Sequence, residues 1–412
     1  MDSKDVKKYM AQDHRARIEE AAGRLAPVLK ETPLIKSDFY SAEAGCDVYL
    51  KPENLQTTGS FKIRGAYNKI ASLDKAEIRK GVISASAGNH AQGVAFSAQK
   101  RGVKATIVMP NITPLLKVDA TEAYGADVVL AGDVYDESFE AATRIAAQKK
   151  LTFVHPFDDY DVLCGQGTIA KEILEELPGA DEILVPIGGG GLIAGILLWA
   201  KAASPKTKVI GVIPEGSPAI KHSLEKGKAV REKDIHTCAE GVAVKQPGDL
   251  TFAAIMKYMD EIVTVSERDI MENILLMMEK HKLVTEAAGV VSLAGAKKRA
   301  RAGRKLVCVI SGGNIDTVTV SSVVNQGMIS RGRIMCFSVE LPDKPGQLVA
   351  VAQLLAREGA NVIELDHNQF KALDRYSDKV VLEVTVETNG HAHIDRVLKA
   401  LSAEGFPISR IY

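Results

Sequence analysis

Between residues 81 and 214, short runs of apolar, often β-branched residues alternate with longer stretches in which apolar positions recur at helical spacing. A short β-branched run bounded by glycine or proline predicts a buried strand, and the 3.6-residue repeat predicts a helix. The expected strands are 81–88 (ending in a turn), 104–110, 127–132, 182–188, 208–214 and, further along, 305–313, and the expected helices are 90–102, 114–126 and 135–150. This alternation predicts an α/β fold of parallel sheets covered by helices.

The rhythm changes after a short polar stretch, "NQGMISRGR" (325–333). Its glycines and polar residues are typical of a linker, which we place at 326–333. Beyond it the expected order is strand, proline-containing loop, helix, strand, strand, helix and strand, up to residue 412. This βαββαβ order predicts a small ferredoxin-like domain over 334–412.

The chain has 412 residues, of which 46% are hydrophobic and 25% are charged, as expected for a globular protein of more than one domain. The formal net charge is zero, so the basic surplus that nucleic-acid binding needs is missing. The longest apolar run, "GLIAGILLWA", is too short to span a bilayer. We therefore expect neither a nucleic acid nor a membrane as a partner.

The cysteines are scattered and form no C-x-x-C pair; they are Cys46, Cys164, Cys238, Cys308 and Cys336. They favour neither a disulfide framework nor a thiolate zinc site, and they indicate a reducing compartment. The charged N-terminal segment lacks the apolar core of a secretory signal. We expect the protein to be cytoplasmic.

Four consecutive glycines stand between a predicted strand and an apolar helix, in "PIGGGGLIAG" (186–195). Glycines allow several backbone N–H groups to converge, and the helix N-terminus adds positive potential, so this turn is suited to a phosphate. The spacing is neither that of a P-loop nor that of a dinucleotide-binding fingerprint. The alternative is a merely flexible turn, although four glycines in a row are entropically costly.

Two other turns follow predicted strands, "SASAGNHAQG" (84–93) and "ISGGN" (310–314). The first, with Ser86, Asn89 and His90, either offers N–H groups to a carboxylate or is an ordinary helix cap. In the second, Ser311 ends an apolar strand, where a serine usually has a structural role. In a doubly wound fold all three turns would face one site, because ligands bind beyond the carboxyl ends of the strands.

Lys62 lies in "TTGSFKIRGA" (57–66), near a predicted helix start. Most lysines are solvated charges, but desolvation lowers the pKa of an amine and makes it nucleophilic toward a carbonyl. An amine nucleophile, a phosphate cradle and a carboxylate-binding turn together fit pyridoxal 5′-phosphate (PLP) held as a Schiff base.

The sequence resembles the fold-type II PLP enzymes, whose fold is tryptophan synthase β-like, and within them the threonine dehydratases (threonine ammonia-lyases). The matching stretches are "KPENLQTTGSFKIRGA", "SASAGNHAQGVA", "VPIGGGGLIAG", "VTEAAG" and "SGGNID", in this order over residues 50–316. The stretches "VELPDKPGQL" and "GANVIEL" resemble an ACT domain. The resemblance implies a catalytic domain over 1–325 with two open twisted sheets, its smaller subdomain (about 49–150) inserted in the larger, and an ACT regulatory domain over 334–412.

The resemblance also implies roles for individual residues. Lys62 would bind the cofactor covalently and later remove the Cα proton, Phe61 would pack against the ring, and Asn89 would contact the ring hydroxyl. Ser311 would meet the pyridine nitrogen, and Gly241 and Glu286 would lie near the cofactor. The phosphate would be enclosed by Gly188, Gly189, Gly190, Gly191 and Leu192, and the substrate carboxylate by the turn of Ser86, Ala87, Gly88, Asn89 and His90.

The serine at position 311 bears on the type of reaction. Many PLP enzymes place an aspartate opposite the pyridine nitrogen, which keeps it protonated and makes the ring a strong electron sink. A serine hydroxyl cannot do so, and Ser311 therefore favours β-elimination, in which a leaving group on Cβ takes the electrons, over transamination. The expected reaction converts L-threonine to 2-oxobutanoate and ammonia, the first step toward isoleucine, with L-serine to pyruvate as a second reaction. The acid that protonates the leaving hydroxyl and the preference between the two substrates stay open.

Serine racemases and serine dehydratases of the same fold are the nearest alternative. The racemases carry a serine before the Gly-Asn-His, where this chain has Ala87, which has no group that transfers a proton. Their metal site includes an acidic residue before a proline, where this chain has Ile213 before Pro214, so we expect no required metal although Glu215 follows. Cysteine synthases have a different lysine context. An alternative from another class is a non-catalytic amino-acid-sensing protein, against which the intact Lys62 argues.

The ACT resemblance implies allosteric control. The loop "PDKPGQL" (342–348) would receive the carboxylate or amine of an effector amino acid, and the expected contacts are Asp343, Gly346, Gln347, Leu348 and Asn361. Isoleucine is the expected effector and valine its expected antagonist; the alternative is a domain that serves only oligomerisation. Because family members are commonly tetramers, we expect a homotetramer. The sign of regulation and the choice between a biosynthetic and a catabolic role stay open.

Overall fold

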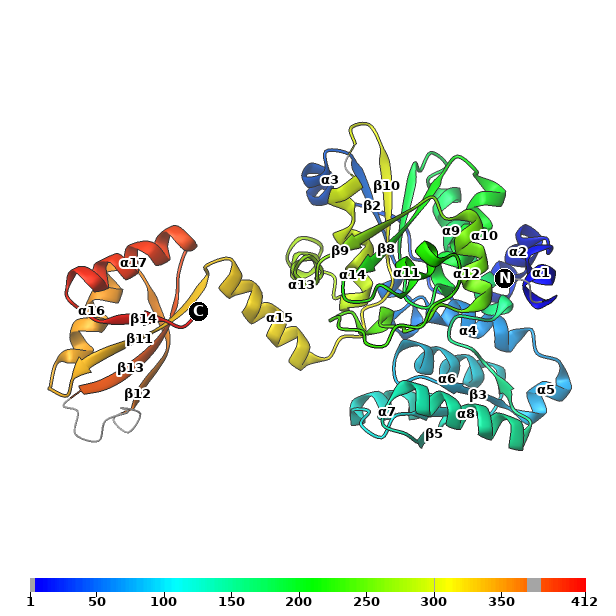
Figure 1. The fold of residues 1–412 in the computed structure, drawn as a ribbon, viewed down its shortest axis with the longest axis horizontal. Helices are drawn as coiled ribbons and strands as arrows, with labels where there is room; N and C mark the ends of the chain where they lie inside the picture. The colour runs from blue at the N-terminus through cyan, green and yellow to red at the C-terminus, as the bar shows by residue number, and fades with distance from the viewer. Residues whose placement is uncertain (1–3, 300, 369–378) are drawn as a thin grey trace. The chain divides into compact units, whose positions relative to one another are not determined.

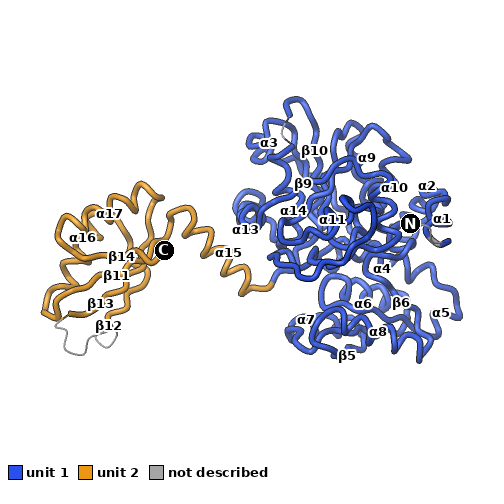
Figure 2. The backbone as a smooth tube through the Cα atoms, viewed as in Figure 1, with its two compact units in different colours: residues 1–315 blue, residues 316–412 orange. Residues whose placement is uncertain are grey.

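The computed structural model describes residues 4–299, 301–368 and 379–412. The chain divides into two compact units, residues 1–315 and 316–412 (Figure 2). The boundary between the units therefore lies before the linker predicted at 326–333. Residues 326–330 of that predicted linker are helical and form the end of α15 (Thr317–Ser330). The side chain of Asp316 caps the start of that helix by accepting a hydrogen bond from the Thr319 N–H at 2.8 Å.

The larger part of the first unit is built on a six-stranded sheet (Figure 1). Its strand order is β1 (Ile35–Lys36), β2 (Asp47–Pro52), β10 (Lys305–Ile310), β7 (Glu182–Pro186), β8 (Lys208–Pro214) and β9 (Glu261–Val265). From β2 to β9 the strands are parallel, and the edge strand β1 is antiparallel to β2. The central strand β7 is buried at every residue, which explains its almost continuous apolar run.

Helices pack on this sheet and form the main core. The helices of the larger part are α1 (Lys4–Met10), α2 (His14–Leu25), α3 (Asp38–Ala44), α9 (Tyr160–Glu176), α10 (Gly191–Ala203), α11 (Ala219–Lys226), α12 (Asp249–Tyr258), α13 (Glu267–Leu276) and α14 (Ala287–Ala294). Helix α10 contacts β7 and β8 and packs on α9, while α14 contacts β7, β8 and β10. Short 3₁₀ and π segments lie at η1 (Glu53–Leu55), η2 (Thr57–Gly59), η3 (Glu240–Val242), η4 (Met277–His281) and η5 (Ala296–Arg299).

A second, four-stranded parallel sheet forms the smaller part of the first unit. Its order is β5 (Asp127–Leu130), β4 (Ala105–Met109), β3 (Val82–Ala85) and β6 (Thr152–Phe153), with helices α4 (Lys62–Ala71), α5 (Lys75–Lys80), α6 (Asn89–Arg101), α7 (Leu115–Glu122) and α8 (Tyr135–Lys149). The bounds differ slightly from the predicted 49–150, because β2 belongs to the larger sheet and β6 extends the smaller one. Helix α4 packs against both α6 and α9 and so joins the two parts.

The second unit has a four-stranded antiparallel sheet in the order β12 (Asn361–Asn368), β13 (Lys379–Glu387), β11 (Ile334–Pro342) and β14 (Ile408–Arg410). Helices α16 (Gln347–Glu358) and α17 (His391–Ala403) complete it (Figure 1). Phe337 and Val384 of the sheet and Leu354 and Ile394 of the helices share one buried core. The predicted βαββαβ order is confirmed, as are the strands and helices predicted for the first unit. Among the described residues, every helix is too short or too polar to span a bilayer.

Candidate active site

Lys62 is the first residue of α4, and its amine is partly buried. Nζ donates a hydrogen bond to the carbonyl oxygen of Pro156 at 2.9 Å and makes no ion pair with any carboxylate of the described residues. Burial lowers the pKa of Lys62 to about 8, although the negative charge of Glu286 works in the opposite direction. A carbonyl partner does not oppose deprotonation as a carboxylate would, and with this pKa about one amine in ten is neutral at pH 7.

The turn before Lys62 is attached to the end of β10 by backbone contacts. The Phe61 N–H donates to the Ser311 carbonyl at 3.1 Å, and the Gly313 N–H donates to the Gly59 carbonyl at 2.9 Å. The Phe61 ring lies beside the amine, with Nζ of Lys62 5.3 Å from the ring centroid. The predicted pair of Phe61 and Lys62 is thus held against the predicted Ser311 turn.

The four-glycine turn joins β7 to α10 with its backbone donors unused. Within the described structure, no hydrogen bond is donated by an N–H group of Gly188–Leu192. Gly190, the N-cap of α10, has φ +92°, and a Cβ on Gly189 would lie 2.5 Å from the Phe157 ring. Since Phe157 follows Pro156, the turn is linked to the Lys62 amine through two consecutive residues. Unpaired donors at a helix start fit a phosphate group.

The turn from Ser86 to His90 joins β3 to α6. The Gly88 N–H donates to Ser86 Oγ at 3.2 Å, and within the described structure the N–H groups of Ala87, Asn89 and His90 donate no hydrogen bond. His90 is buried, and Nε2 lies 3.0 Å from the Val154 carbonyl. Burial and the Lys62 charge lower the pKa of His90 to about 3, so its imidazole is neutral. The turn therefore offers N–H groups rather than a cationic side chain.

Asn89 connects this turn to Glu286. Its Nδ2 donates to Glu286 Oε1 at 2.6 Å. Burial raises the pKa of Glu286 to about 7, although the Asn89 hydrogen bond works against that rise. Gly241 lies beside the same carboxyl group, because a Cβ built on it would be 3.9 Å from Glu286 Oε1. The structure thus brings Asn89, Glu286 and Gly241 together from three distant segments, and all three are residues that the resemblance implies lie near the cofactor.

Ser311 ends β10 and is 4% exposed. Its Oγ donates to the Ala288 carbonyl at 3.1 Å. A hydroxyl hydrogen rotates about the C–O bond, so this buried group can turn its single O–H from the carbonyl toward an unprotonated ring nitrogen. We call the group formed by Lys62, Asn89, Gly188–Leu192, Glu286 and Ser311 the Lys62 site.

Sequence reasoning missed a cluster of charges next to this site. Arg64 is fully buried; its Nε and Nη2 donate to Glu53 at 2.7 and 2.8 Å, and its Nη1 and Nη2 donate to Glu172 at 2.6 and 2.8 Å. Lys51 Nζ also donates to Glu172 at 2.6 Å. This buried ionic cluster (Lys51, Glu53, Arg64 and Glu172) ties α4 to α9 and β2. Its signal was in "KPENLQTTGSFKIRGA", which holds three of its members.

Another residue that sequence reasoning missed is Asn314, although it stands in the quoted "ISGGN". Its side chain donates hydrogen bonds to the Thr58 carbonyl and to Asn89 Oδ1. A further histidine, His155, lies close enough for the Lys62 charge to add to the effect of burial, and its pKa falls to about 4. The motif alone gave no sign of either contact.

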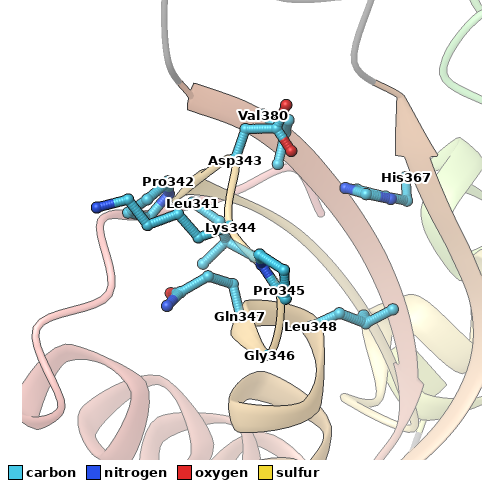
Figure 3. A pocket seen from close by; sticks show the side chains of 10 residues that line it. All are labelled: Leu341, Pro342, Asp343, Lys344, Pro345, Gly346, Gln347, Leu348, His367 and Val380. Atoms are coloured by element: carbon cyan, nitrogen blue, oxygen red, sulfur yellow. The ribbon is translucent and has the colours of Figure 1, made fainter.

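A separate pocket of about 290 Å³ lies within the second unit (Figure 3). It is lined by Leu341, Pro342, Asp343, Lys344, Pro345, Gly346, Gln347, Leu348, His367 and Val380. Four of the predicted effector residues are therefore brought together at the start of α16, where Gly346 has φ +95°.

The structure does not bring Asn361 to this pocket among the residues described. Asn361 begins β12 and pairs with Glu387, whereas the pocket residue His367 pairs with Leu382 near the other end of the strand. Six residues of strand separate Asn361 from His367, which is about 20 Å at 3.3 Å per residue.

Comparison with known proteins agrees with this arrangement. The profile of a family described as pyridoxal-phosphate dependent enzyme matches residues 25–312. An L-threonine ammonia-lyase of Thermotoga maritima is 44% identical over 392 residues, which cover 95% of this chain and 98% of that protein.

Two solved structures share the fold. The processed form of threonine deaminase isoform 2 from Solanum lycopersicum has a TM-score of 0.74 at 37% identity, covering 80% of this chain and 90% of that one. A maize serine racemase has a TM-score of 0.72 at 32% identity, covering 77% of this chain and 98% of that one. The predicted fold class is confirmed by these likenesses.

Proposed function

The chain belongs to the family of pyridoxal-phosphate-dependent enzymes, and we propose that it deaminates L-threonine to 2-oxobutanoate and ammonia. PLP is the cofactor of this family. The observation that carries the proposal is the partly buried Lys62 amine, which has a carbonyl partner at Pro156 and a lowered pKa, together with the Gly188–Leu192 turn against Phe157, whose N–H groups donate no hydrogen bond within the described residues. An uncompensated amine and an anion-binding turn are together what a phosphorylated aldehyde needs.

The residues of the Lys62 site each have a part in holding the cofactor. When bound, PLP withdraws electrons from the Cα of the amino acid joined to it, which makes the Cα proton acidic. Lys62 would hold the cofactor through Nζ, the N–H groups of Gly188–Leu192 would bind its phosphate, and Ser311 would pair with its ring nitrogen. Asn89 would donate the N–H that Glu286 leaves free.

Lys62 is also the base of the proposed reaction. Its neutral amine takes the proton from the threonine Cα, for which a pKa near the working pH is well suited. The electron pair on Cα then expels the hydroxyl group from Cβ, which leaves as water with one added proton. The released enamine takes up one water and loses ammonia, so one threonine gives one 2-oxobutanoate and one ammonia.

The substrate carboxylate would be bound by the turn of Ser86 to His90. Because His90 is neutral, attraction would come from the free N–H groups at the start of the 13-residue helix α6. Ala87 stands in this turn and has no proton-transferring group, which supports elimination over racemisation. L-serine differs from L-threonine by one methyl group, and we infer that it is deaminated to pyruvate as well.

The second unit would supply regulation. Its pocket brings Asp343, Gly346, Gln347 and Leu348 to the start of α16, where a helix N-terminus attracts a carboxylate. We infer that isoleucine binds there as the end product and that valine opposes it. A cytoplasmic homotetramer is the proposed working form.

The test is the steady-state formation of 2-oxoacid from L-threonine and from L-serine, with and without isoleucine and valine. Borohydride reduction of the purified holoenzyme, followed by peptide mass analysis, should leave a pyridoxyl group on Lys62. A colourless protein without 2-oxoacid formation would favour a non-catalytic amino-acid sensor. Racemisation of L-serine faster than its deamination would favour a serine racemase.

A further inference from the structure

Asn314 connects three segments that are far apart in the sequence. It lies just after β10, and its Nδ2 donates to the Thr58 carbonyl at 2.7 Å and to Asn89 Oδ1 at 2.8 Å. Thr58 belongs to the turn that leads into Lys62, and Asn89 begins α6. Asn314 therefore contacts a residue of the Lys62 site from outside it.

The two hydrogen bonds of Asn89 fix the orientation of its amide. An asparagine amide has one oxygen that accepts and one nitrogen with two N–H donors. Asn89 Oδ1 accepts from Asn314, and Asn89 Nδ2 donates to Glu286 Oε1. Rotating the amide by half a turn would set two NH₂ groups against each other at Asn314 and two oxygens against each other at Glu286. One N–H of Asn89 then remains without a partner among these contacts, on the nitrogen that faces Glu286.

The second contact of Asn314 supports a strained turn. Thr58 has φ +67° and ψ +9°, a left-handed conformation that is unfavourable for a β-branched residue. Its carbonyl accepts from Asn314, and Gly59 follows with φ +72°. A Cβ on Gly59 would lie 2.3 Å from Asn314 Oδ1, so the glycine leaves room for the asparagine. Asn314 thus stabilises this strained turn and binds Asn89 with the same amide nitrogen.

We propose that Asn314 is a positioning residue for Asn89: it holds the Asn89 amide with its free N–H available to the ring oxygen of the cofactor. This inference rests on the proposed PLP site. Asn314 itself is exposed and acts through Asn89, and its bond to Thr58 keeps the turn before Lys62 in register with the end of β10.

The test is a double-mutant cycle with Asn89→Ala and Asn314→Ala in the full-length holoenzyme. Equilibrium dialysis gives the dissociation constant of PLP, and the visible absorption band of the bound cofactor reports the environment of its ring. We expect Asn314→Ala to raise the PLP dissociation constant about tenfold and to shift the band, because one fixed hydrogen bond to the cofactor is lost. In the Asn89→Ala background the same substitution should change the constant by no more than about twofold.

Two further variants sharpen the test. Asn314→Asp keeps the size of the side chain but replaces the donor with an acceptor, so it should weaken PLP binding at least as much as Asn314→Ala. Asn111→Ala is the control, since Asn111 is also exposed and donates one hydrogen bond, to Asp133 at 3.1 Å. It should leave PLP binding and the band unchanged.

The outcomes separate the two proposals. Equal effects of Asn314→Ala in both backgrounds, or a lower melting temperature with unchanged PLP binding and band, would overturn the role of Asn314 and leave the proposed function intact. A wild-type protein that binds no PLP would overturn both.

Discussion

Lys62 of the Lys62 site and Arg64 of the buried ionic cluster lie two residues apart on helix α4, and the surroundings of these two desolvated cations shift their pKa values in opposite directions. Arg64 is bound by the carboxylates of Glu53 and Glu172, which outweigh its burial and raise its pKa. Lys62 has only a carbonyl partner among the described residues, and burial lowers its pKa to about 8. The same helix start thus carries one cation that is fully ion-paired and one that has no ion pair among the described residues.

This difference gives Arg64 a structural role and Lys62 a chemical one. If the Arg64 guanidinium moved away, Glu53 would be left buried without a counter-charge, so Arg64 fixes α4 against α9 and against the η1 segment that follows β2. An amine without an ion pair can change its protonation state and form a covalent bond at low cost. The cluster next to Lys62 therefore holds the helix in place while the amine itself stays available.

The largest expected effect on the comparison comes from Lys62→Ala. It should reduce turnover of L-threonine about 10⁴-fold or more, because the amine is both the covalent anchor and the base. When the two proteins are compared free of PLP, thermal stability should be unchanged or slightly higher, since no ion pair is lost. Steady-state 2-oxoacid assays and a melting curve measure the two quantities. Retained turnover in this variant would contradict the proposed mechanism.

Arg64→Met should have the reverse profile. It leaves the fully buried Glu53 without its cation, while the partly exposed Glu172 keeps its ion pair with Lys51, and the free energy of unfolding should fall by about 3–5 kcal/mol. The matched control is Arg15→Met, which breaks an exposed pair with Glu19 and should cost about 0.5 kcal/mol or less. Denaturant unfolding of the three proteins gives the comparison. If Arg64→Met lost activity at full stability, the division between the two regions would be wrong.

How much of the site could be read from the sequence depends on the range of each interaction. Lys62, Asn89 and the four glycines were predictable because strand, turn and helix start are all local in sequence, and their chemistry is visible in the residue types. The pairing of Arg64 with Glu172 spans 108 positions and depends on how α4 packs on α9. A local sequence pattern therefore cannot show that these two residues pair.

The structure departs from the sequence predictions at residues 326–330 and at Asn361, and in both cases secondary structure that the composition does not reveal decides the position. Residues 326–330 look like a linker by composition, but the Asp316 cap starts a helix that continues through Gly327, whose intrinsic cost is about 1 kcal/mol. The sequence predicts that Asn361 lies with the effector loop, because both stand in the ACT-like stretches. The antiparallel register of β12 and β13 carries it to the opposite end of the strand from His367.

The glycine turn extends the comparison from side chains to the backbone: among the described residues its N–H groups donate no hydrogen bond, just as the Lys62 amine has no ion-pair partner. Gly189→Ala would place a Cβ 2.5 Å from the Phe157 ring and shift the turn. We expect the PLP dissociation constant to rise about 10- to 100-fold, as several weak donors move together. Gly23→Ala is the control, because a Cβ at Gly23 in α2 meets nothing within 4 Å. Unchanged PLP binding in Gly189→Ala would mean that the phosphate lies elsewhere.

The smallest effect concerns the pH dependence of the Lys62 amine in protein freed of PLP. With a pKa of about 8, roughly one amine in ten is neutral at pH 7, against about one in a few thousand for an ordinary lysine. Because the neutral amine is the nucleophile, the rate at which PLP rebinds covalently should rise about tenfold between pH 7 and pH 9 and then level off. Stopped-flow absorbance follows the reaction, and Lys62→Ala provides the baseline. A rate that kept rising tenfold per pH unit up to pH 10 would show an amine with an ordinary pKa. The contrast in pKa shift between Lys62 and Arg64 would then be wrong.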